Sequence, residues 1–446
     1  MIEISTELIK EAIYKLCFDA NTCLDEKIYS KILKAYENTQ SEQLKSILQN
    51  AKIAYDTKKP LCQDTGQVLV FLEIGQDVHL TGDFIEDAIN SAVEKCYLEN
   101  YFRKSVVKNA VFDRANTNTN TPTIIYTKHI KGSEINIKVL IKGAGSENKS
   151  KLEMMLPTAN EEEIIEFCSN TIIEASKNSC PPLFVGIGIG GSAEKAVLLS
   201  KEALLENEQN NLALKIQNKS NEKELCVLDV KLLSCATHIA CMPVAITINC
   251  HSDRTSSCSI KNNEIIYNHK TPNFIEYEEN NSEKEIFIND ITSIKNLKEG
   301  EEVLLTGEMF VARDMAHKRL KEMMDKGENL PIDLKDKVIF YAGPCPNKEG
   351  EIIGSIGPTT SSRMDKYALD FYNKGILATV GKGNRSEEVK ECIKKNNAKY
   401  FSITGGIAAL LSNKVKKKEI IAFEDLGAEA LYCIEVEKFP VKIEIG

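Results

Sequence analysis

Three short segments place cysteine residues where they could support metal-binding or nucleophilic chemistry. In KPLCQDTG (59–66), Cys62 lies in a loop beside the carboxylate of Asp64. Cys180 precedes two prolines and a glycine-rich run, and Cys250 stands at the end of an apolar run. A thiolate in such a loop can ligate a metal centre or act as a nucleophile. Each cysteine taken singly also fits a buried loop residue, because cysteine is among the most buried residue types.

The segment ATHIACMPVAITINCHSDR (236–254) also contains the residue types of a zinc site. His238, Cys241, Cys250 and His251 lie close together in it. A structural zinc site, however, takes four ligands, usually as two closely spaced pairs, and no second pair is present. None of the 14 cysteines forms a CxxC pair, which argues against a zinc ribbon and a thioredoxin-type motif.

The glycines of PPLFVGIGIGGSAEKA match the pattern GxGxxG at Gly186, Gly188 and Gly191. Dinucleotide-binding domains use this pattern between a strand and a helix, with an acidic residue at the end of the next strand about 20 residues on. Residues 204–215 (LLENEQNNLALK) fit a helix and a polar loop instead. The sequence therefore favours another role, in which the glycines let backbone amides approach an anion or a cluster at a helix N-terminus.

Five loops place arginine or lysine beside glycine, serine or threonine. They are FRKSVV (102–107), KGAGSENKS (142–150), VARDMAHKRL (311–320), GPTTSSRMD (357–365) and VGKGNRS (380–386). Any one of them fits a solvated surface charge, which commonly contributes little. Several follow apparent strands, where open α/β sheets bind ligands. Together they favour a binding site for a small polyanion, since arginine pairs with carboxylates through two parallel hydrogen bonds.

Taken together, these segments resemble the class I fumarase family, the iron–sulfur-dependent fumarate hydratases and their tartrate dehydratase relatives. The matching strings are CQDTG, FRKSVV, KGAGSEN, GIGIGGSAEKA, HIACMPVAITINCHSDR, LTGEMFVARDMAHKRL, YAGPCP, GPTTSSRMD, GKGNRS and TGGIAALL. They run in the family's order between about residues 55 and 435. Many relatives carry the two halves as separate α and β subunits, whereas this chain resembles a fusion of the two.

The resemblance implies a [4Fe–4S] cluster held by three cysteines, with one iron left open. By the matching strings these cysteines are Cys62, Cys180 and Cys250, and Cys241 is the main alternative for the third ligand. An open iron can act as a Lewis acid that binds a substrate hydroxyl and carboxylate. A cluster used only for electron transfer would not need an open site.

The resemblance also implies roles for residues in both halves of the chain. Thr359 would be the general base, with Arg363 and Lys382 as neighbouring cations, because a hydroxyl is a poor base unless its alkoxide is stabilised. His238 and Asp64 would lie near the leaving hydroxyl as proton donor or relay. The contacts implied for the substrate carboxylates come from Gln63, Arg103, Gly145, Arg313, Arg363 and Lys382.

The activity implied by the resemblance is the reversible hydration of fumarate to L-malate by a hydro-lyase. The same chemistry on tartrate or mesaconate is the nearest alternative, and a nicotinamide-dependent oxidoreductase and an iron–sulfur sensor are more distant ones. A small dicarboxylate is then the expected ligand, and the family implies a homodimer. One departure bears on the ligand, since Ala144 stands where many relatives have glycine, next to the expected contact at Gly145.

Composition limits the kind of protein in which these residues act. The 446 residues exceed what one hydrophobic core usually organises, so we expect two domains or more. An apolar content of 42% and a charged content of 27% indicate a soluble globular protein, and a net charge of −9 argues against nucleic acid and anionic membranes as partners. No apolar run is long enough to span a membrane, and the N-terminus has the pattern of an amphipathic helix and not of a signal peptide. We therefore expect a cytoplasmic protein.

The elements that must position these residues alternate in type along the chain. Helices are expected within 3–55 and at 84–99, 161–177 and 315–327, and strands at 68–75, 135–143, 181–191, 243–250, 286–290, 301–314, 338–343, 376–383 and 400–406. The sequence thus predicts an α/β protein with a mixed α/β cluster-binding domain at 1–276, an acidic linker at 277–284 and a smaller, swivelling α/β domain at 285–446. Because the expected base falls in the second domain and the cysteines fall in the first, we expect the active site in the cleft between them.

Overall fold

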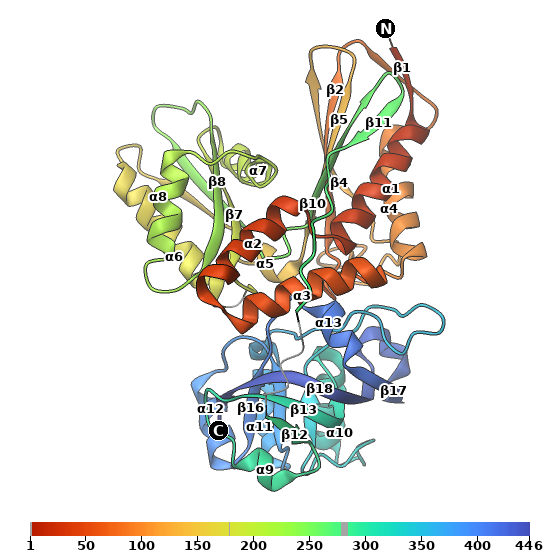
Figure 1. Cartoon of the computed structure of the whole chain (residues 1–446), viewed down its shortest axis with the longest axis vertical. Coiled ribbons are helices and arrows are strands. Elements are labelled where there is room, and N and C mark those ends of the chain that lie inside the picture. Colours follow the sequence, from red (N-terminus) through yellow and green to blue (C-terminus); the bar gives the residue numbers. More distant parts are fainter. Residues whose placement is uncertain (1, 178, 278–283) are drawn as a thin grey trace. The chain divides into compact units, whose positions relative to one another are not determined.

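A computed structural model of the chain describes residues 2–177, 179–277 and 284–446. The chain divides into two units, Met1–Ile275 and Glu276–Gly446, each with its own sheets and helices (Figure 1). The predicted linker at 277–284 lies almost entirely outside the described residues. Helices and sheet occur in both units, which confirms the predicted mixed α/β class.

One sheet of the first unit has five strands. Its strands run in the order β11 (Glu264–Tyr267), β10 (Thr255–Lys261), β5 (Ile135–Lys142), β2 (Gln67–Gly75) and β4 (Ile124–Ile130). Helices α1 (Thr6–Thr22) and α4 (Ile85–Glu99) lie side by side, and α1 packs on β5 and β10 (Figure 1). Ile13 of α1 and Ile89 of α4 share a core with Val70 and Val139 of the sheet. The strands predicted at 68–75 and 135–143 are confirmed.

The N-terminal region is helical, as the apolar spacing predicts. Helix α1 begins after Ser5, whose Oγ accepts a hydrogen bond from the Glu7 amide at 3.2 Å, a common N-terminal cap. Two further helices follow, α2 (Glu26–Thr39) and α3 (Glu42–Thr57). A short parallel pair, β1 (Ile2–Ser5) with β3 (Val78–Thr81), was not predicted from the sequence.

Another sheet of the first unit has four strands in the order β6 (Lys151–Met155), β9 (Met242–Asn249), β7 (Leu183–Ile189) and β8 (Val227–Ser234). The short helix α5 (Ala144–Glu147) precedes it, and α6 (Glu161–Ser176), α7 (Ala193–Ala203) and α8 (Asn211–Ser220) connect its strands. Helix α6 begins with a reciprocal cap, in which Asn160 accepts from the Glu163 amide and the Glu163 side chain accepts from the Asn160 amide. The strands predicted at 181–191 and 243–250 and the helix predicted at 161–177 are confirmed.

Glycines in β7 allow close packing of α7. A Cβ added at Gly186 would lie 2.0 Å from the Ser200 carbonyl oxygen, and one at Gly188 would lie 2.1 Å from that of Ala196. These two glycines therefore have a packing role, which differs from the anion-binding role that the sequence favoured. Residues 204–215 form a loop and the first half of α8, so the strand end that a dinucleotide site requires at this point is absent from the described chain.

The chain crosses from one sheet of the first unit to the other at residues 250–254. Strand β9 ends at Asn249, and β10 begins at Thr255 in the five-stranded sheet. Within the four-stranded sheet, Asn249 pairs with Phe184 at the start of β7. The crossing thus joins two strand ends that belong to different sheets, and it carries the cysteine of the CHSDR segment.

The second unit is built on a seven-stranded sheet. Its order is β12 (Glu285–Phe287), β13 (Glu302–Val311), β14 (Val338–Phe340), β15 (Ala378–Gly381), β16 (Lys399–Ser402), β18 (Leu431–Ile445) and β17 (Val415–Ala422). Strands β12 to β16 pair in parallel, whereas β18 runs antiparallel to β16 and also pairs back with β13. The connecting helices are α9 (Ile291–Lys295), α10 (Asp314–Lys326), α11 (Asp365–Asn373), α12 (Glu387–Lys395) and α13 (Ala408–Asn413). All five strands predicted for this half are present. Because β12 to β16 run parallel to one another, their carboxyl ends lie along one edge of the sheet.

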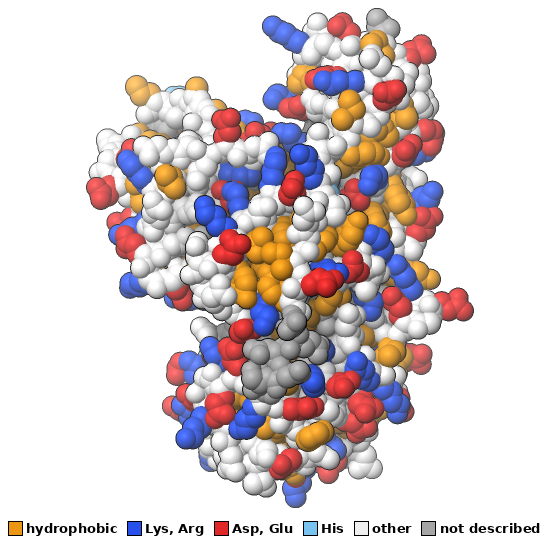
Figure 2. Space-filling model, viewed as in Figure 1, with side chains coloured by type: hydrophobic (Ala, Val, Ile, Leu, Met, Phe, Trp, Pro, Cys, Tyr) orange, Lys and Arg blue, Asp and Glu red, His pale blue; other side chains and the backbone are white. Residues whose placement is uncertain are grey.

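Charged side chains of both signs are intermixed on the face drawn in Figure 2. No extended basic area is visible on that face, in keeping with the net charge of −9. Among the described residues, no helix has the length and apolar character needed to cross a membrane.

Candidate active site

The three predicted cluster ligands lie in loops at strand ends of the first unit. Cys250 follows β9 directly, and Cys180 lies shortly before β7, whose Phe184 pairs with Asn249 at the end of β9. Cys62 lies in the loop that precedes β2. The register of β7 and β9 therefore explains why two cysteines that are far apart in the sequence share one end of a sheet.

The thiol of Cys62 is influenced by the other two cysteines. Burial raises the pKa of Cys62 to about 12, the Arg254 guanidinium acts to lower this pKa, and Cys250, Asp64 and Cys180 act to raise it. Such Coulombic effects are strong only over short distances and in a poorly solvated setting. The three thiols thus lie near one another, with Cys62 buried and with Cys180 and Cys250 partly exposed.

Each of the other two cysteines is fixed by its loop. Cys180 has a left-handed backbone with φ of 57°, and its carbonyl oxygen accepts a hydrogen bond from His251 Nδ1 at 3.2 Å. The Cys250 sulfur lies 3.0 Å from Ser252 Oγ. His251 is buried and links the Cys250 turn to the Cys180 loop. The sequence placed His251 inside a matching string without assigning it this positioning role.

The donor set fits a multi-iron cluster better than a single metal ion. Among the described residues, no group of three His, Cys, Asp or Glu side chains is arranged to hold one ion. A zinc site needs its ligands around one centre, whereas an iron–sulfur cluster takes each thiolate on a different iron. Three thiols close enough to affect one another, beside a buried arginine, match the second arrangement.

Arg254 is the buried cation of this neighbourhood. Its side-chain Nη1 donates to the Asp64 carbonyl oxygen at 2.6 Å and to Asn21 Oδ1 of α1 at 3.3 Å. Only 4% of the residue is exposed, and no carboxylate in the described part of the chain lies within ion-pair distance of it. Burial acts to lower the pKa of Arg254, but Cys62, Cys250 and Asp64 raise it overall. A buried guanidinium therefore faces the thiols without a formal ion-pair partner.

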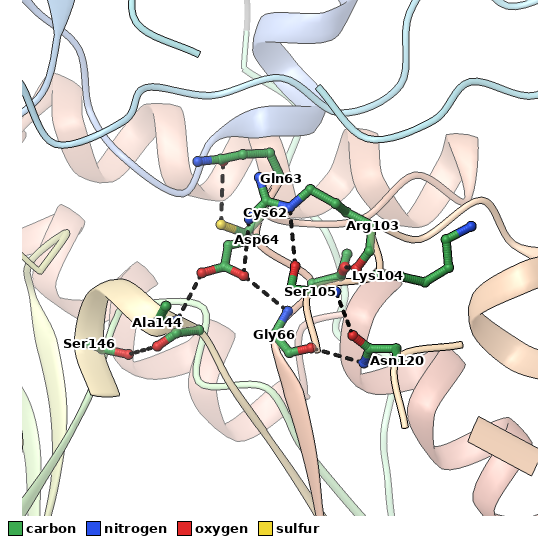
Figure 3. Close-up of polar contacts among 12 residues, drawn as sticks. Cys62, Gln63, Asp64, Gly66, Arg103, Lys104, Ser105, Asn120, Ala144 and Ser146 are labelled. Atoms are coloured by element: carbon green, nitrogen blue, oxygen red, sulfur yellow. Dashed lines mark hydrogen bonds and ion pairs between the residues drawn. The ribbon is translucent and has the colours of Figure 1, made fainter. Parts of the chain in front are cut away.

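Asp64 is held as an anion (Figure 3). Its carboxylate accepts from the Ala144 amide at 2.9 Å and the Gly66 amide at 3.2 Å, and it lies 3.3 Å from Arg103 Nη2. Burial acts to raise the pKa of Asp64, but the Arg103 and Arg254 guanidiniums and the two amides hold it below its usual value. At neutral pH this side chain accepts hydrogen bonds and has no proton to give. The replacement of glycine by Ala144 preserves a backbone amide that binds Asp64.

Lys142, at the end of β5, connects the site to the Cys250 turn. Its ammonium group donates to the Ile248 carbonyl oxygen and to Asn249 Oδ1, and it lies 3.5 Å from Glu147 Oε2. Burial lowers the pKa of Lys142 to about 8, although Glu147 acts to raise it. The segment from the end of β5 to the start of α5 thus contacts both cysteine loops, through Lys142 on one side and the amide of Ala144 on the other.

The remaining predicted residues of the first unit differ in exposure. Gln63 is buried, and its Oε1 lies 3.5 Å from the Cys62 sulfur (Figure 3). Gly145 is exposed within α5, and His238 lies in the exposed segment 234–240. The Nδ1 of His238 accepts from the Ala240 amide at 3.1 Å, which leaves Nε2 as the ring nitrogen that can carry a proton.

In the second unit, the Thr359 loop is joined to the ends of two parallel strands. The Thr359 amide donates to the carbonyl oxygen of Tyr341, directly after β14, at 2.6 Å. The Thr359 carbonyl accepts from the Lys382 amide, directly after β15, at 3.2 Å. Thr359 is only 8% exposed. The predicted base and the predicted cation therefore lie together at the carboxyl ends of parallel strands, where such sheets bind ligands.

Two predicted arginines lie at the same edge and are oriented by carboxylates. Arg363 donates from Nε and Nη2 to the two oxygens of Asp314, at 3.0 and 2.6 Å. Arg313, which follows β13, bonds through Nη2 to Glu429 and lies 3.6 Å from Asp314 through Nε. Glu429 also accepts from the Met315 amide at 2.9 Å. The structure thus gathers Arg313, Arg363, Thr359 and Lys382 in this unit.

Some residues that organise the site carried no recognisable signal in the sequence. Arg385 is buried, bonds Asp365 at 2.6 Å and lies over the rings of Tyr341 and Tyr400 at 5.4 and 5.2 Å. Asp314 and Glu429 likewise act through the arginines that they orient. Arg385 and Asp314 lie in two of the cationic loops and in matching strings but were assigned no role, and no string covered Glu429.

Two protein-family models together match almost the whole chain. A family model described as fumarate hydratase (fumerase) matches residues 10–259, and one described as fumarase C-terminus matches residues 260–446. The aerobic class I fumarate hydratase of Escherichia coli K12 is 30% identical over 99% of this chain and 88% of its own length. The mitochondrial fumarate hydratase 1 of Leishmania major is 30% identical over 90% of this chain and 80% of its own length. A putative L(+)-tartrate dehydratase subunit alpha of Methanocaldococcus jannaschii is 36% identical over 58% of this chain and 97% of its own length.

Proposed function

Because the chain belongs to the class I fumarate hydratase family and is therefore a hydro-lyase, we propose that it catalyses the reversible, stereospecific hydration of fumarate to L-malate. The observation that carries this proposal is the match of the two family models over residues 10–446. The grouping of cations with a buried threonine at one strand edge supports it, because a dicarboxylate requires cations at both ends.

We propose Cys62, Cys180 and Cys250 as the ligands of a [4Fe–4S] cluster. The mutual proximity of the three thiols and the buried charge of Arg254 beside them support this assignment. When bound, the cluster supplies a Lewis-acidic iron for the substrate hydroxyl and an adjoining carboxylate.

Arginine, lysine and backbone groups would hold the carboxylates of the substrate. In the second unit these groups are Arg313, Arg363 and Lys382, and in the first unit they are Gln63, Arg103 and Gly145. Asp314 accepts hydrogen bonds from Nε and Nη2 of Arg363, and this pairing fixes the plane of the guanidinium. The Nη1 group would then be the donor for a substrate carboxylate. The binding groups are thus oriented before substrate arrives, which reduces the entropy lost on binding.

The proposed proton-transfer roles are those that the family resemblance implies. Thr359, as the alkoxide, would take the proton from the carbon beside one carboxylate, and the nearby Lys382 and Arg363 would stabilise that alkoxide. Asp64 is ionised at neutral pH, so it would accept a hydrogen bond from the leaving water or from a donor. Of the two residues expected near the hydroxyl, His238 is therefore the one that would deliver a proton.

Tartrate dehydration is the second candidate function. The relative named as a putative tartrate dehydratase subunit alpha supports it, with 36% identity over 58% of this chain. Both reactions remove water from a hydroxy dicarboxylate, so the cysteines and the arginines would act in the same way in each. The two substrates differ by one hydroxyl group, and a polar side chain that pairs with that group could discriminate strongly between them.

The experiment is an assay of anaerobically purified protein with L-malate, D-malate, both tartrate enantiomers and mesaconate. Fumarate formation is followed by its ultraviolet absorbance. We expect turnover of L-malate and fumarate, loss of activity in air, and recovery after anaerobic treatment with iron, sulfide and a thiol. If a tartrate enantiomer is turned over faster than L-malate, tartrate and not malate is the substrate. An iron-loaded protein without turnover of any of these acids would contradict the enzymatic proposal and favour a sensor.

A further inference from the structure

Arg254 has a position that the proposed reaction does not explain by itself. It ends the crossing between β9 and β10, on the same turn as Cys250. Its main-chain carbonyl accepts from the Ile141 amide of β5 at 2.9 Å, so its backbone is anchored in the five-stranded sheet. Its side chain points back to the Cys62 loop and bonds the Asp64 carbonyl oxygen at 2.6 Å. One residue therefore links two ligand loops.

Within the described residues, no carboxylate forms an ion pair with this side chain. Arg254 is 4% exposed, and its hydrogen-bond acceptors are a main-chain carbonyl and the amide oxygen of Asn21. Asp64, the carboxylate that acts on it, is already bound by Arg103 and two main-chain amides. Buried charges in proteins are ordinarily paired, because an unpaired one costs several times more than a neutral polar group.

A cluster bound by the three cysteines would provide the missing negative charge. Thiolates and inorganic sulfides together give such a site a net negative charge. A fixed positive charge beside it favours the more negative, reduced state over the oxidised state. An arginine retains its charge at any physiological pH, so this effect does not depend on protonation.

We propose that Arg254 is the internal countercharge of the cluster site, and that it both joins the Cys62 and Cys250 loops and raises the reduction potential of the bound cluster. This inference rests on the proposed cluster ligation. Arg254 acts through the ligand loops and is a positioning residue that does not itself contact the substrate.

The test compares three variants of the full chain after anaerobic reconstitution. Arg254→Gln removes the charge, Arg254→Lys keeps it without the forked donor, and Asn21→Ala removes one hydrogen-bond partner without changing charge. The oxidised and reduced cluster are measured by electron paramagnetic resonance during a redox titration. We expect Arg254→Gln to shift the equilibrium at least about tenfold toward the oxidised state, which corresponds to about 59 mV for one electron. Arg254→Lys and Asn21→Ala should shift it less than about threefold, or about 28 mV on the same scale.

A second readout measures how tightly the cluster is held. We expect Arg254→Gln to release iron to a chelator at least about tenfold faster than wild type, in proportion to the lost countercharge and loop contact. An unchanged potential and release rate in Arg254→Gln would overturn the inference. Should that variant fail to fold, a tenfold shift in Arg254→Lys, which keeps the charge, would overturn it equally.

The outcomes separate this inference from the proposed function. Wild-type protein that binds a cluster and hydrates fumarate, together with an unaltered potential in Arg254→Gln, would refute only the role of Arg254. Wild-type protein that takes up no iron under anaerobic reconstitution would refute the cluster ligation, and the role of Arg254 would fall with it.

Discussion

The surroundings of His317 predict how the free energy of unfolding of the second unit changes as the pH falls. The imidazole is buried in the core of the second unit, where its ring stacks on Phe371 with centroids 4.8 Å apart and meets Tyr341 edge-on at 5.2 Å. Its Nδ1 lies 3.1 Å from the carbonyl oxygen of Arg313, one of the proposed substrate ligands. Burial lowers the pKa of His317 from 6.5 to about 4.

The sign of the effect follows from which state takes up the proton. As the pH falls through 6.5, the imidazole in the unfolded chain becomes protonated, whereas the buried ring stays neutral until about pH 4. The stability present above pH 6.5 is therefore lost progressively toward pH 4. Between pH 7.5 and pH 5.0 the free energy of unfolding of this unit should fall by about 2 kcal/mol from this one group, or about 30-fold in the equilibrium constant.

The perturbation is His317→Phe, which keeps an aromatic ring against Phe371 and removes the titration. Loss of the contact to the Arg313 carbonyl should cost about 1 kcal/mol at every pH, as a constant offset. Hydrogen exchange with mass spectrometry, read on peptides that cover β14 and β15, gives the opening free energy of the unit. Wild type and variant are compared at the same pH, so that carboxylates common to both cancel. If the difference between the two proteins is the same at pH 7.5 and pH 5.0, the buried neutral imidazole is not the cause and the reasoning is refuted.

Four further predictions concern the site and its support. Thr359→Ala should lower turnover at least about 100-fold without loss of iron, whereas Thr359→Ser should retain part of the turnover. Full activity in the alanine variant would show that Thr359 is not the base. Serine at each of the three proposed ligand positions should abolish iron retention, measured by iron and sulfide analysis, and Cys241→Ser should leave it intact; the opposite pattern would reassign the third ligand. Asp314→Ala should raise KM about tenfold with a smaller change in kcat, because Arg363 loses its orientation; an unchanged KM would contradict this role. Gly188→Ala should lower the free energy of unfolding by roughly 1–3 kcal/mol through a clash with α7, and calorimetry without a shift would show that the helix can move.

Much of the fold could be predicted because local pattern and tertiary environment agree. The apolar run at 135–143 and the acidic first turn of 161–177 each indicated one element, and β5 and α6 occupy those positions. Strand β18 was missed although its alternation of apolar and charged residues is typical of a strand, because Pro440 within the run argues against one. That proline is accommodated where the pairing of β18 with β13 shifts register and Lys438 adopts a φ of 51°. Such tolerance depends on a partner strand, which a single sequence does not reveal.

The site residues were predicted from matching strings, and their grouping could not be predicted from spacing. Cys180 and Cys250 are brought to one sheet end by the pairing of Phe184 with Asn249, a long-range register. Arg254 was missed as a functional residue for a different reason. Arginine is mostly exposed in proteins, so an arginine after a cysteine turn is expected to face solvent. Only the fold shows that this one is buried beside thiols.

The ion pairs of the second unit bear on how it would bind a dianion. Arg363 is about half exposed, with 52% of its side chain accessible, and its pair with Asp314 lies partly in water. Exposed pairs contribute little stability, so Asp314 is better explained as a group that sets the plane of the guanidinium. Glu429 does the same for Arg313, whose side chain is only 17% exposed. A substrate carboxylate would then add to an arginine that is already oriented, without first displacing its partner. Because each such arginine is already paired with a carboxylate, the site carries less positive charge than its residue count implies, so it would hold a dianion less tightly and release a dianionic product more readily.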